Sequence, residues 1–153
     1  IDLLGRKLTM QQGKAMKLLA GEMKTVIEAA MAIDELKPYA KQLLEKLELN
    51  KEVMTFLMGF AMQGDYQRFL SDATIFMEFF GTIIIGWQWL KIAVNAKQGL
   101  LTGDKTHTAA FYQSKVHTMK FFYKYEMPRT TGLANILMDD TVLTLPTEEE
   151  VFA

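Results

Sequence analysis

Apolar residues dominate one stretch of the chain, Asp65 to Gln98, more than any other. Within it they recur at alternating steps of four and three residues, the period of a helix that packs against other helices. These positions are Phe69, Ala73, Phe76, Phe80, Ile83, Trp87, Leu90 and Val94. Because apolar residues also fill most remaining positions between Ala73 and Leu90, water should reach little of the middle of this helix. The sequence therefore predicts a buried central helix over residues 65–98.

A helix over residues 65–98 would be about 50 Å long, because each helical residue adds about 1.5 Å. This exceeds what a small domain needs, so part of its surface should meet something besides the chain's own helices. Four large apolar side chains are surplus to the repeating stripe: Ile75, Phe79, Ile84 and Trp89. A surplus patch of this size is unusual on a soluble monomer. We therefore expect a homo-oligomer formed through the 65–98 helix, most simply a two-fold dimer.

The segment from Ala73 to Val94 also approaches the roughly 20 apolar residues that span a bilayer. It contains Glu78, Gln88 and Lys91, and no basic cluster flanks it. Because a charge at the centre of a bilayer is costly, we expect no membrane span. The chain has no cysteine, which fits a reducing compartment, and its first residues have too short an apolar core for a signal peptide. We expect a cytoplasmic protein.

A first amphipathic helix is predicted before the central one. It should begin near Thr9, because Thr9 and Gln12 have the spacing of a capping box. Its apolar residues repeat at steps of three and four, with lysines and glutamates on the other faces. The stripe consists of Met16, Leu19, Met23, Val26, Ala30 and Ile33.

A second helix should begin at Asp34, whose side chain can cap free amides, with Pro38 in the first turn. Asn50 interrupts its apolar stripe, and we interpret this residue as a register-setting or locally bonded polar group rather than a ligand. Gly64 followed by Asp65 indicates a very short turn, so the second and central helices must be antiparallel. The stripe consists of Leu36, Ala40, Leu43, Leu47, Met54, Leu57 and Ala61.

A fourth helix is expected after a loop at 100–106. Pro128 should kink or break it before an apolar face resumes at Leu133. From Asp139 the pattern is lost, residues 141–145 alternate like an extended strand, and residues 148–150 are all glutamate. The stripe before Pro128 consists of Ala109, Tyr112, Val116, Met119 and Tyr123. The predicted fold class is all-α: an up-down-up-down four-helix bundle with long helices, a kinked last helix and a short extended acidic tail.

The chain offers little catalytic chemistry. Its 153 residues suffice for one domain, and its formal net charge of −1 gives no field that favours nucleic acid. A di-iron bundle needs inward glutamates and Glu-x-x-His pairs, which are missing here. The two histidines, His107 and His117, are ten residues apart and more typical of a surface than of a metal site. Hydrolase and phosphate-loop motifs are also absent. We assign no catalytic residue and no metal ligand.

Two features of the sequence can each be interpreted in two ways. Glu78 lies in apolar sequence, so burial could raise its pKa and suit it to proton transfer, or it could simply pair with a lysine or be exposed at a gap. The run from Lys120 to Tyr125 mixes lysines and aromatic residues as RNA-binding or membrane surfaces do. A helix that alternates core aromatics with solvated lysines explains that run equally well.

Two segments resemble a known family. The first eight residues, Ile1 to Leu8, resemble the segment that follows the Tyr-Glu-Gly-Thr-Asn motif in long-form acyl-CoA dehydrogenases, which carry an extra C-terminal helical domain. The stretch from Phe111 to Pro128 is similar to the closing helix of that domain, with an aromatic-Tyr-x-x-Lys pattern and a later proline. The similarity extends from Ile1 to about Met138. The chain begins with Ile1 rather than methionine, and we expect it to be cut from a longer protein.

The resemblance implies a parent flavoenzyme that oxidises an acyl-CoA thioester to the 2,3-enoyl-CoA and passes electrons to an electron-transfer flavoprotein. FAD would belong to the parent, and the fragment alone would hold none and be inactive, because the family's catalytic glutamate lies in the motif upstream of Ile1. Residues 1–8 would end the preceding dehydrogenase domain, residues 9–138 would form the bundle, and residues 139–153 the tail. Arg6 belongs to the matching stretch, and neither it nor Glu78 is given a role in the active site.

The resemblance further implies that the domain covers the dehydrogenase body and supports subunit assembly, with the rest of the dehydrogenase chain as its partner. Two other classes stay open on the residues alone. A free-standing adaptor would bind a partner through the surplus face of the 65–98 helix. A peripheral membrane module would use the aromatic and lysine face near Lys120.

Overall fold

The computed structural model describes residues 2–139, without the side chains of residues 2–12, 16, 66, 68 and 69. That part of the chain is helical and contains no strand, which confirms the predicted all-α class. The predicted tail lies outside the described residues, apart from Asp139. The helices are α1 (Asp2–Met31), α2 (Lys37–Met62), α3 (Tyr66–Ser71), α4 (Ala73–Thr102), α5 (Ala109–Tyr125) and α6 (Arg129–Leu137).

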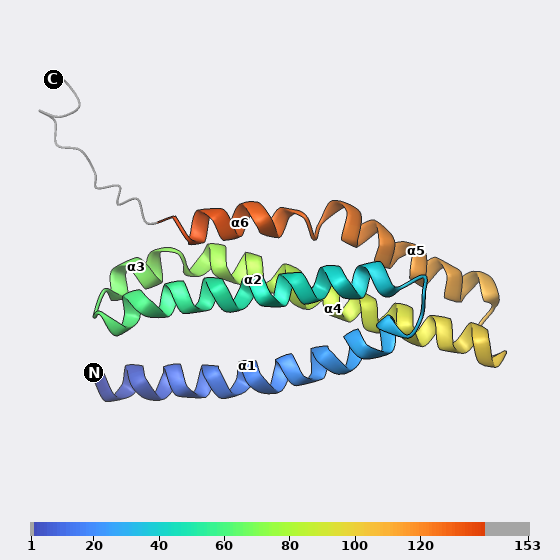
Figure 1. Ribbon diagram of the computed structural model, residues 1–153, viewed down its shortest axis with the longest axis horizontal. Helices are drawn as coiled ribbons and strands as arrows, with labels where there is room; N and C mark the ends of the chain where they lie inside the picture. Colours follow the sequence, from blue (N-terminus) through green and yellow to red (C-terminus); the bar gives the residue numbers. More distant parts are fainter. Residues whose placement is uncertain (1, 140–153) are drawn as a thin grey trace, which may run out of the picture.

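The helices lie along one common axis (Figure 1). In that view α1 runs from left to right, α2 returns, α4 runs to the right again, and α5 and α6 return together. α4 packs against α1, α2, α5 and α6, whereas α1 packs mainly against α2 and α4. The segment predicted to be central therefore contacts more of the long helices than any of its neighbours does.

The first helix begins earlier than expected. α1 is continuous from Asp2, so Thr9 and Gln12 lie inside it and do not cap its start. The residues before Thr9 are mostly leucine, lysine and arginine, which favour helix, and no proline interrupts them. The helix also runs through the boundary proposed between residues 8 and 9.

The second helix begins later than expected. Leu36, and not Asp34, occupies the N-cap position of α2, and no side-chain hydrogen bond caps that end. Pro38 lies in the first turn, as predicted. At the other end, Gly64 has a φ of 84°, a left-handed conformation that costs glycine little. The amide of Asp65 donates to the carbonyl of Phe60 at 2.9 Å, which closes the helix end and turns the chain back after α2.

The expected single helix over residues 65–98 is wrong in its bounds, because the chain is broken at Asp72 into α3 and α4. Asp72 precedes α4 with a φ of −98° and a ψ of 4°. Serine and aspartate at 71 and 72 compete for backbone hydrogen bonds and favour turns over helix interiors. α4 also continues to Thr102, so the loop predicted over residues 100–106 begins only at Gly103.

The last helical segment is broken where proline predicts it. The Thr108 side chain accepts a hydrogen bond from the amide of Phe111 at 3.1 Å and caps the start of α5. α5 ends at Tyr125, and Pro128 is the N-cap residue of α6. The expected kink or break at Pro128 is confirmed as a break.

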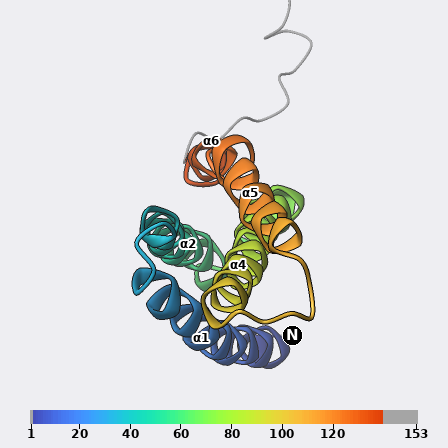
Figure 2. The same ribbon diagram turned by 90° about the vertical axis from the view of Figure 1, so that its right-hand side faces the viewer.

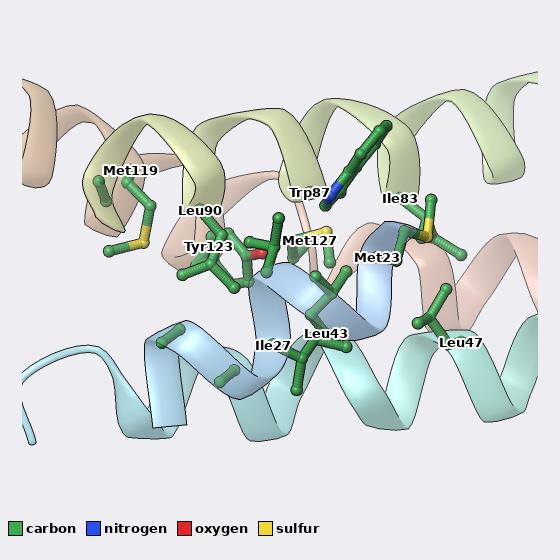
Figure 3. Packing of buried hydrophobic residues seen from close by; sticks show 14 of the residues in the cluster. Met23, Ile27, Leu43, Leu47, Ile83, Trp87, Leu90, Met119, Tyr123 and Met127 are labelled. Carbon is green, nitrogen blue, oxygen red and sulfur yellow. The ribbon is translucent and has the colours of Figure 1, made fainter. Parts of the chain in front are cut away.

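The core confirms most of the predicted stripes of α1, α2 and α5. Figure 3 shows side chains from these helices and from α4 pointing into one shared interior. Ile27 and Val53 belong to the core although neither was in a predicted stripe. Asn50 is buried, and its side-chain oxygen has no hydrogen-bond partner. The predicted stripe residues that are buried are Met23, Val26, Ala30, Leu36, Ala40, Leu43, Leu47, Leu57, Tyr112, Val116, Met119 and Tyr123.

α4 and the α5–α6 junction approach each other closely at Gly86. A Cβ atom at this position would lie 2.7 Å from the sulfur of Met127, so no larger residue fits without moving that side chain. At the same level, the hydroxyl of the buried Tyr123 donates a hydrogen bond of 2.8 Å to the carbonyl of Gly86. Glycine therefore brings α4 within hydrogen-bond reach of α5.

An acidic residue in the α1–α2 turn joins three parts of the fold. The Glu35 carboxylate forms ion pairs with Lys97 of α4 and with Lys120 of α5, the latter at 2.6 Å. The hydrogen bond from Lys120, followed by that from Lys97, lowers the pKa of Glu35. Glu35 in turn raises the pKa of Lys120. These ion pairs hold the α1–α2 turn against α4 and α5.

Acidification should therefore remove a stabilising contribution from Glu35. Because the folded-state pKa lies below the ordinary value of 4.5, this contribution is present above pH 4.5 and disappears as the pH falls through the folded pKa. The group is partly exposed, so Glu35→Gln should cost no more than about 1 kcal/mol at pH 7 and less at pH 3. Urea unfolding at both pH values measures the difference, with Glu52→Gln as a control at an exposed position. An equal deficit of Glu35→Gln at both pH values would contradict this role.

Candidate functional site

One side of α4 carries large apolar residues that the described helices do not cover. Met77 is 64% exposed, Ile85 49% and Ile92 37%. At 3.6 residues per turn, these positions and their exposed or half-buried neighbours fall within about 140° of the helix surface. We call this surface the open face of α4. It consists of Thr74, Met77, Glu78, Gly81, Ile84, Ile85, Gln88, Lys91, Ile92 and Asn95.

The expectation that water reaches little of the middle of this helix is wrong. Only 28% of the most apolar 18-residue stretch of α4 is buried. In the end-on view of Figure 2, α1, α2 and α5 lie around α4 and leave one of its sides without a described helix. α1, α2, α5 and α6 pack on other sides of α4, so this side is not covered by them.

The surplus residues are not those that the repeating stripe indicated. Phe79 is completely buried and belongs to the core, whereas Phe76 and Phe80 of the predicted stripe are half-buried. Ile75, Ile84 and Trp89 are half-buried. The later part of the predicted stripe is confirmed, because Ile83, Trp87, Leu90 and Val94 are buried. Phe79 joins these residues in the core, and Met77 is exposed.

Glu78 does not lie in an apolar interior. Its side chain is exposed, and its carboxylate has no ion-pair partner among the described residues. Its backbone carbonyl accepts a hydrogen bond of 2.8 Å from the Thr82 hydroxyl. Lys91, three turns and a half further along the same face, is also exposed, with its ammonium 6.0 Å from the centre of the Trp87 ring. The face therefore carries one free acidic and one basic group.

The loop between α4 and α5 forms a second surface feature, an open hollow of about 570 Å³. Asp104 organises it by accepting hydrogen bonds from the amide and hydroxyl of Thr106, at 2.9 and 2.6 Å, which lower the pKa of Asp104. His107 stacks on Phe111 with a centroid distance of 4.2 Å. The hollow is shaped by these contacts within one turn, in which the Thr106 hydroxyl and amide both donate to the same carboxylate.

The histidines are placed on the surface. His107 lies in this loop and His117 on an exposed position of α5. Among residues 2–139, no group of three or more histidine, aspartate or glutamate side chains could hold a metal ion. The structure does not bring the two histidines together with carboxylates.

The aromatic and lysine run is divided between core and surface. Tyr123 is buried, Phe122 is half-buried, and Phe121 and Tyr125 are exposed with ring centroids 4.7 Å apart. Lys120 is bound to Glu35, and Lys124 lies 5.2 Å from the centre of the Tyr125 ring. Most of the run is thus explained by packing and by pairs within the chain.

α4 is the one described helix long and apolar enough to cross a membrane by length and composition. A core helix of a soluble protein passes the same test, so this property is weak evidence. Other helices, among them α1, α2, α5 and α6, pack on α4, and its open face carries Glu78 and Lys91. Both groups would be costly in the hydrocarbon of a bilayer.

The described residues form an all-α domain whose most unusual surface is an uncovered apolar helix face. A family model described as acetyl-CoA dehydrogenase C-terminal like matches residues 19–146. The match covers most of the chain, which therefore belongs to this family of acyl-CoA dehydrogenase C-terminal domains. No curated protein and no solved structure matches it.

Proposed function

We propose that the chain is the non-catalytic C-terminal domain of an FAD-dependent acyl-CoA dehydrogenase. The parent enzyme would oxidise an acyl-CoA to its 2,3-enoyl-CoA in the cytoplasm and pass the electrons to an electron-transfer flavoprotein. The family match over residues 19–146 supports the relation to these enzymes. The resemblance of residues 1–8 to the segment after the catalytic motif supports a position directly behind the dehydrogenase body.

The domain's role in this proposal is packing on the dehydrogenase body and subunit assembly. The observation that carries it is the open face of α4, where Met77 and Ile85 are about half-exposed or more. Burying a large apolar side chain gains about 1.5–3 kcal/mol, so such a face is stabilised when another protein surface covers it. A contact of this kind with the dehydrogenase body or with another subunit would support assembly.

The described residues do not fit FAD. The hollow between α4 and α5 is bounded by a single loop and the start of α5, and its hydrogen-bonding residue Asp104 is already engaged by Thr106. A second hollow, on α2, is lined by the acidic side chains Glu45, Glu48 and Glu52. An acidic group there would repel a pyrophosphate. Flavin binding and the catalytic base are therefore assigned to the dehydrogenase body of the parent, and no step of the reaction is derived through this domain.

The isolated 153-residue chain should bind no FAD tightly and oxidise no acyl-CoA. Proton abstraction needs a base within hydrogen-bond reach of the substrate, and the proposal places that base in another part of the parent. Absorbance near the flavin bands after purification, and dye reduction with acyl-CoAs of several lengths, measure both properties. The full-length parent is the positive control. A yellow isolated domain with stoichiometric flavin would refute the assignment.

The coding sequence upstream of Ile1 separates this proposal from the adaptor alternative, which the open face of α4 would also serve. A Tyr-Glu-Gly-Thr-Asn motif directly before Ile1, preceded by some 400 residues or roughly three further domains, would support the dehydrogenase parent. A start codon at that point would favour a free-standing interaction domain.

A further inference from the structure

An exposed aromatic pair lies on the outer side of α5. Phe121 is 56% exposed and Tyr125 52%, and their ring centroids are 4.7 Å apart. Both positions lie on the side of the helix opposite the buried Met119 and Tyr123, and no described helix covers them. Covering two such rings removes a large apolar area from water and is favourable. We call Phe121, Tyr125 and the neighbouring, exposed Lys124 the aromatic–lysine surface of α5.

The charge around this surface is basic. Residues 109–137 contain four basic side chains and one acidic side chain, and the acidic one, Glu126, lies 3.3 Å from Arg129. Lys124 has no ion-pair partner among the described residues, and its ammonium lies 5.2 Å from the centre of the Tyr125 ring. A ligand that suits this surface therefore combines negative charge with an apolar side chain.

The C-terminal part of the same chain has this chemistry. Residues 140–153, which lie outside the described residues, contain four acidic side chains and no basic one. Three of the acidic residues are consecutive, Glu148 to Glu150, and Val151 and Phe152 follow them directly. Negative charge and an aromatic side chain thus occur together within five residues.

The segment is long enough to reach the aromatic–lysine surface. Figure 1 shows α6 and α5 in line along one edge of the bundle, and the segment follows α6 in the chain. α6 has nine residues and is about 14 Å long, and the short connection before it adds about 10 Å at most. Lys124 therefore lies about 25 Å from the end of α6, whereas the nine residues from Asp139 to Glu148 can extend over about 30 Å. Phe152 reaches one helical turn further, to Phe121.

The nearest alternative surface is less suitable. α2 lies beside α6, where Lys46 donates a hydrogen bond of 2.9 Å to the Thr131 hydroxyl. The hollow on this part of α2 is lined by three glutamates and by Lys46 itself, so its charge balance is acidic and repels further glutamates. Attachment to the same chain also favours the segment over a free acidic peptide, because a connected ligand of matching length has an effective concentration in the millimolar range.

We propose that the acidic C-terminal segment, Glu148 to Phe152, binds the aromatic–lysine surface of α5 in the same chain. The glutamates lie beside Lys124, and Phe152 packs against Phe121 and Tyr125. The contact does not depend on the dehydrogenase assignment, and the acidic run lies beyond residue 146, the last one that the family model matches. The bound segment covers the solvent-facing part of the Lys120–Tyr125 run, so any other acidic ligand of this surface has to displace it.

Cysteine cross-linking tests the position of the segment, since the chain contains no cysteine. Thr118 is exposed, one turn before Phe121 on the same side of α5. In the full chain, Thr118→Cys combined with Ala153→Cys should form an intramolecular disulfide in a glutathione buffer. Thr55→Cys with Ala153→Cys is the matched control, because Thr55 is an exposed threonine on α2 near the level where α6 ends. An unbound segment would reach Thr55 more easily, whereas the proposal predicts an effective concentration about tenfold or more higher for the Thr118 pair.

Charge variants in the Thr118 and Ala153 cysteine background test which groups meet. Lys124→Glu should lower the effective concentration about fivefold, and adding Glu149→Lys should restore most of it. Lys41→Glu, at an exposed position of α2, is the control and should change nothing. Phe121→Ala with Tyr125→Ala should lower cross-linking without loss of helical circular dichroism, because both rings are exposed.

Three results would overturn the proposal. Cross-linking of the Thr118 pair no higher than that of the Thr55 pair would show that the segment does not bind α5. Covalent dimers in place of intramolecular disulfides would assign the surface to the segment of a second copy. Flotation of the full chain with vesicles of phosphatidylcholine and phosphatidylserine, lost in Lys124→Glu and accompanied by control-level cross-linking, would assign the surface to an anionic membrane.

Discussion

Replacing Tyr123 by alanine should lower the free energy of unfolding by about 3–5 kcal/mol, the usual cost of removing a large buried aromatic side chain. Tyr123 is 1% exposed and lies where α2, α4 and α5 meet. Its ring packs edge-on against Tyr39 with a centroid distance of 5.6 Å, and its hydroxyl donates to the carbonyl of Gly86. The variant therefore loses packing against two helices and the hydrogen bond to α4. Urea unfolding followed by circular dichroism measures the change.

Tyr123→Phe separates the two contributions, because it keeps the ring and removes the hydroxyl. It should cost about 1 kcal/mol, the typical net value of one hydrogen bond. Burial raises the pKa of Tyr123, so the hydroxyl stays protonated and able to donate throughout the neutral range. If alanine cost no more than phenylalanine, the ring could not be the packing centre that the structure indicates.

Phe79→Ala should also destabilise the protein by about 3–5 kcal/mol, because this side chain is completely buried. Phe80→Ala is the matched comparison, since its ring is only half-buried on the neighbouring position of the same helix. It should cost clearly less, and Met77→Ala, at a side chain 64% exposed, should cost least. Thermal and urea unfolding of the three variants give the order.

These three variants test whether the structure or the apolar repeat correctly identifies the phenylalanine in the core. The repeat of apolar residues places Phe76 and Phe80 in the core and leaves Phe79 as surplus. A larger loss for Phe80→Ala than for Phe79→Ala would support that pattern and contradict the complete burial of Phe79 in the structure.

Local patterns predicted the helices with clear amphipathic stripes. α1, α2 and α5 each have one polar and one apolar side, so the apolar period alone assigned Met23, Leu43 and Val116 to the core, where the structure places them. Gly64 and Pro128 marked the turn after α2 and the break before α6, because the backbone restrictions of glycine and proline act within a few residues. The resemblance to the dehydrogenase family also came from the sequence.

The candidate site could be predicted only in part. That the 65–98 segment carries more apolar surface than a core requires was visible in the sequence, but which residues are surplus was not. The apolar repeat correctly placed Ile83, Trp87, Leu90 and Val94 in the core, but α4 is apolar on most sides, so the repeat did not distinguish Phe79 from Phe76 and Phe80. Glu35 gave no signal at all, since its partners Lys97 and Lys120 are distant in sequence.

The sequence by itself determined the all-α class, the positions of most helices and the faces of the amphipathic ones, because these follow from interactions between residues three or four apart. Only the tertiary structure decided the complete burial of Phe79 in place of Phe76 and Phe80, the exposure of Met77, and the ion pairs of Glu35. Those features depend on where α1, α2 and α5 pack around α4. Phe76, Phe79 and Phe80 lie close together on an apolar helix, and the neighbouring helices decide which of them is fully buried, since burying any one of these rings gains a similar free energy.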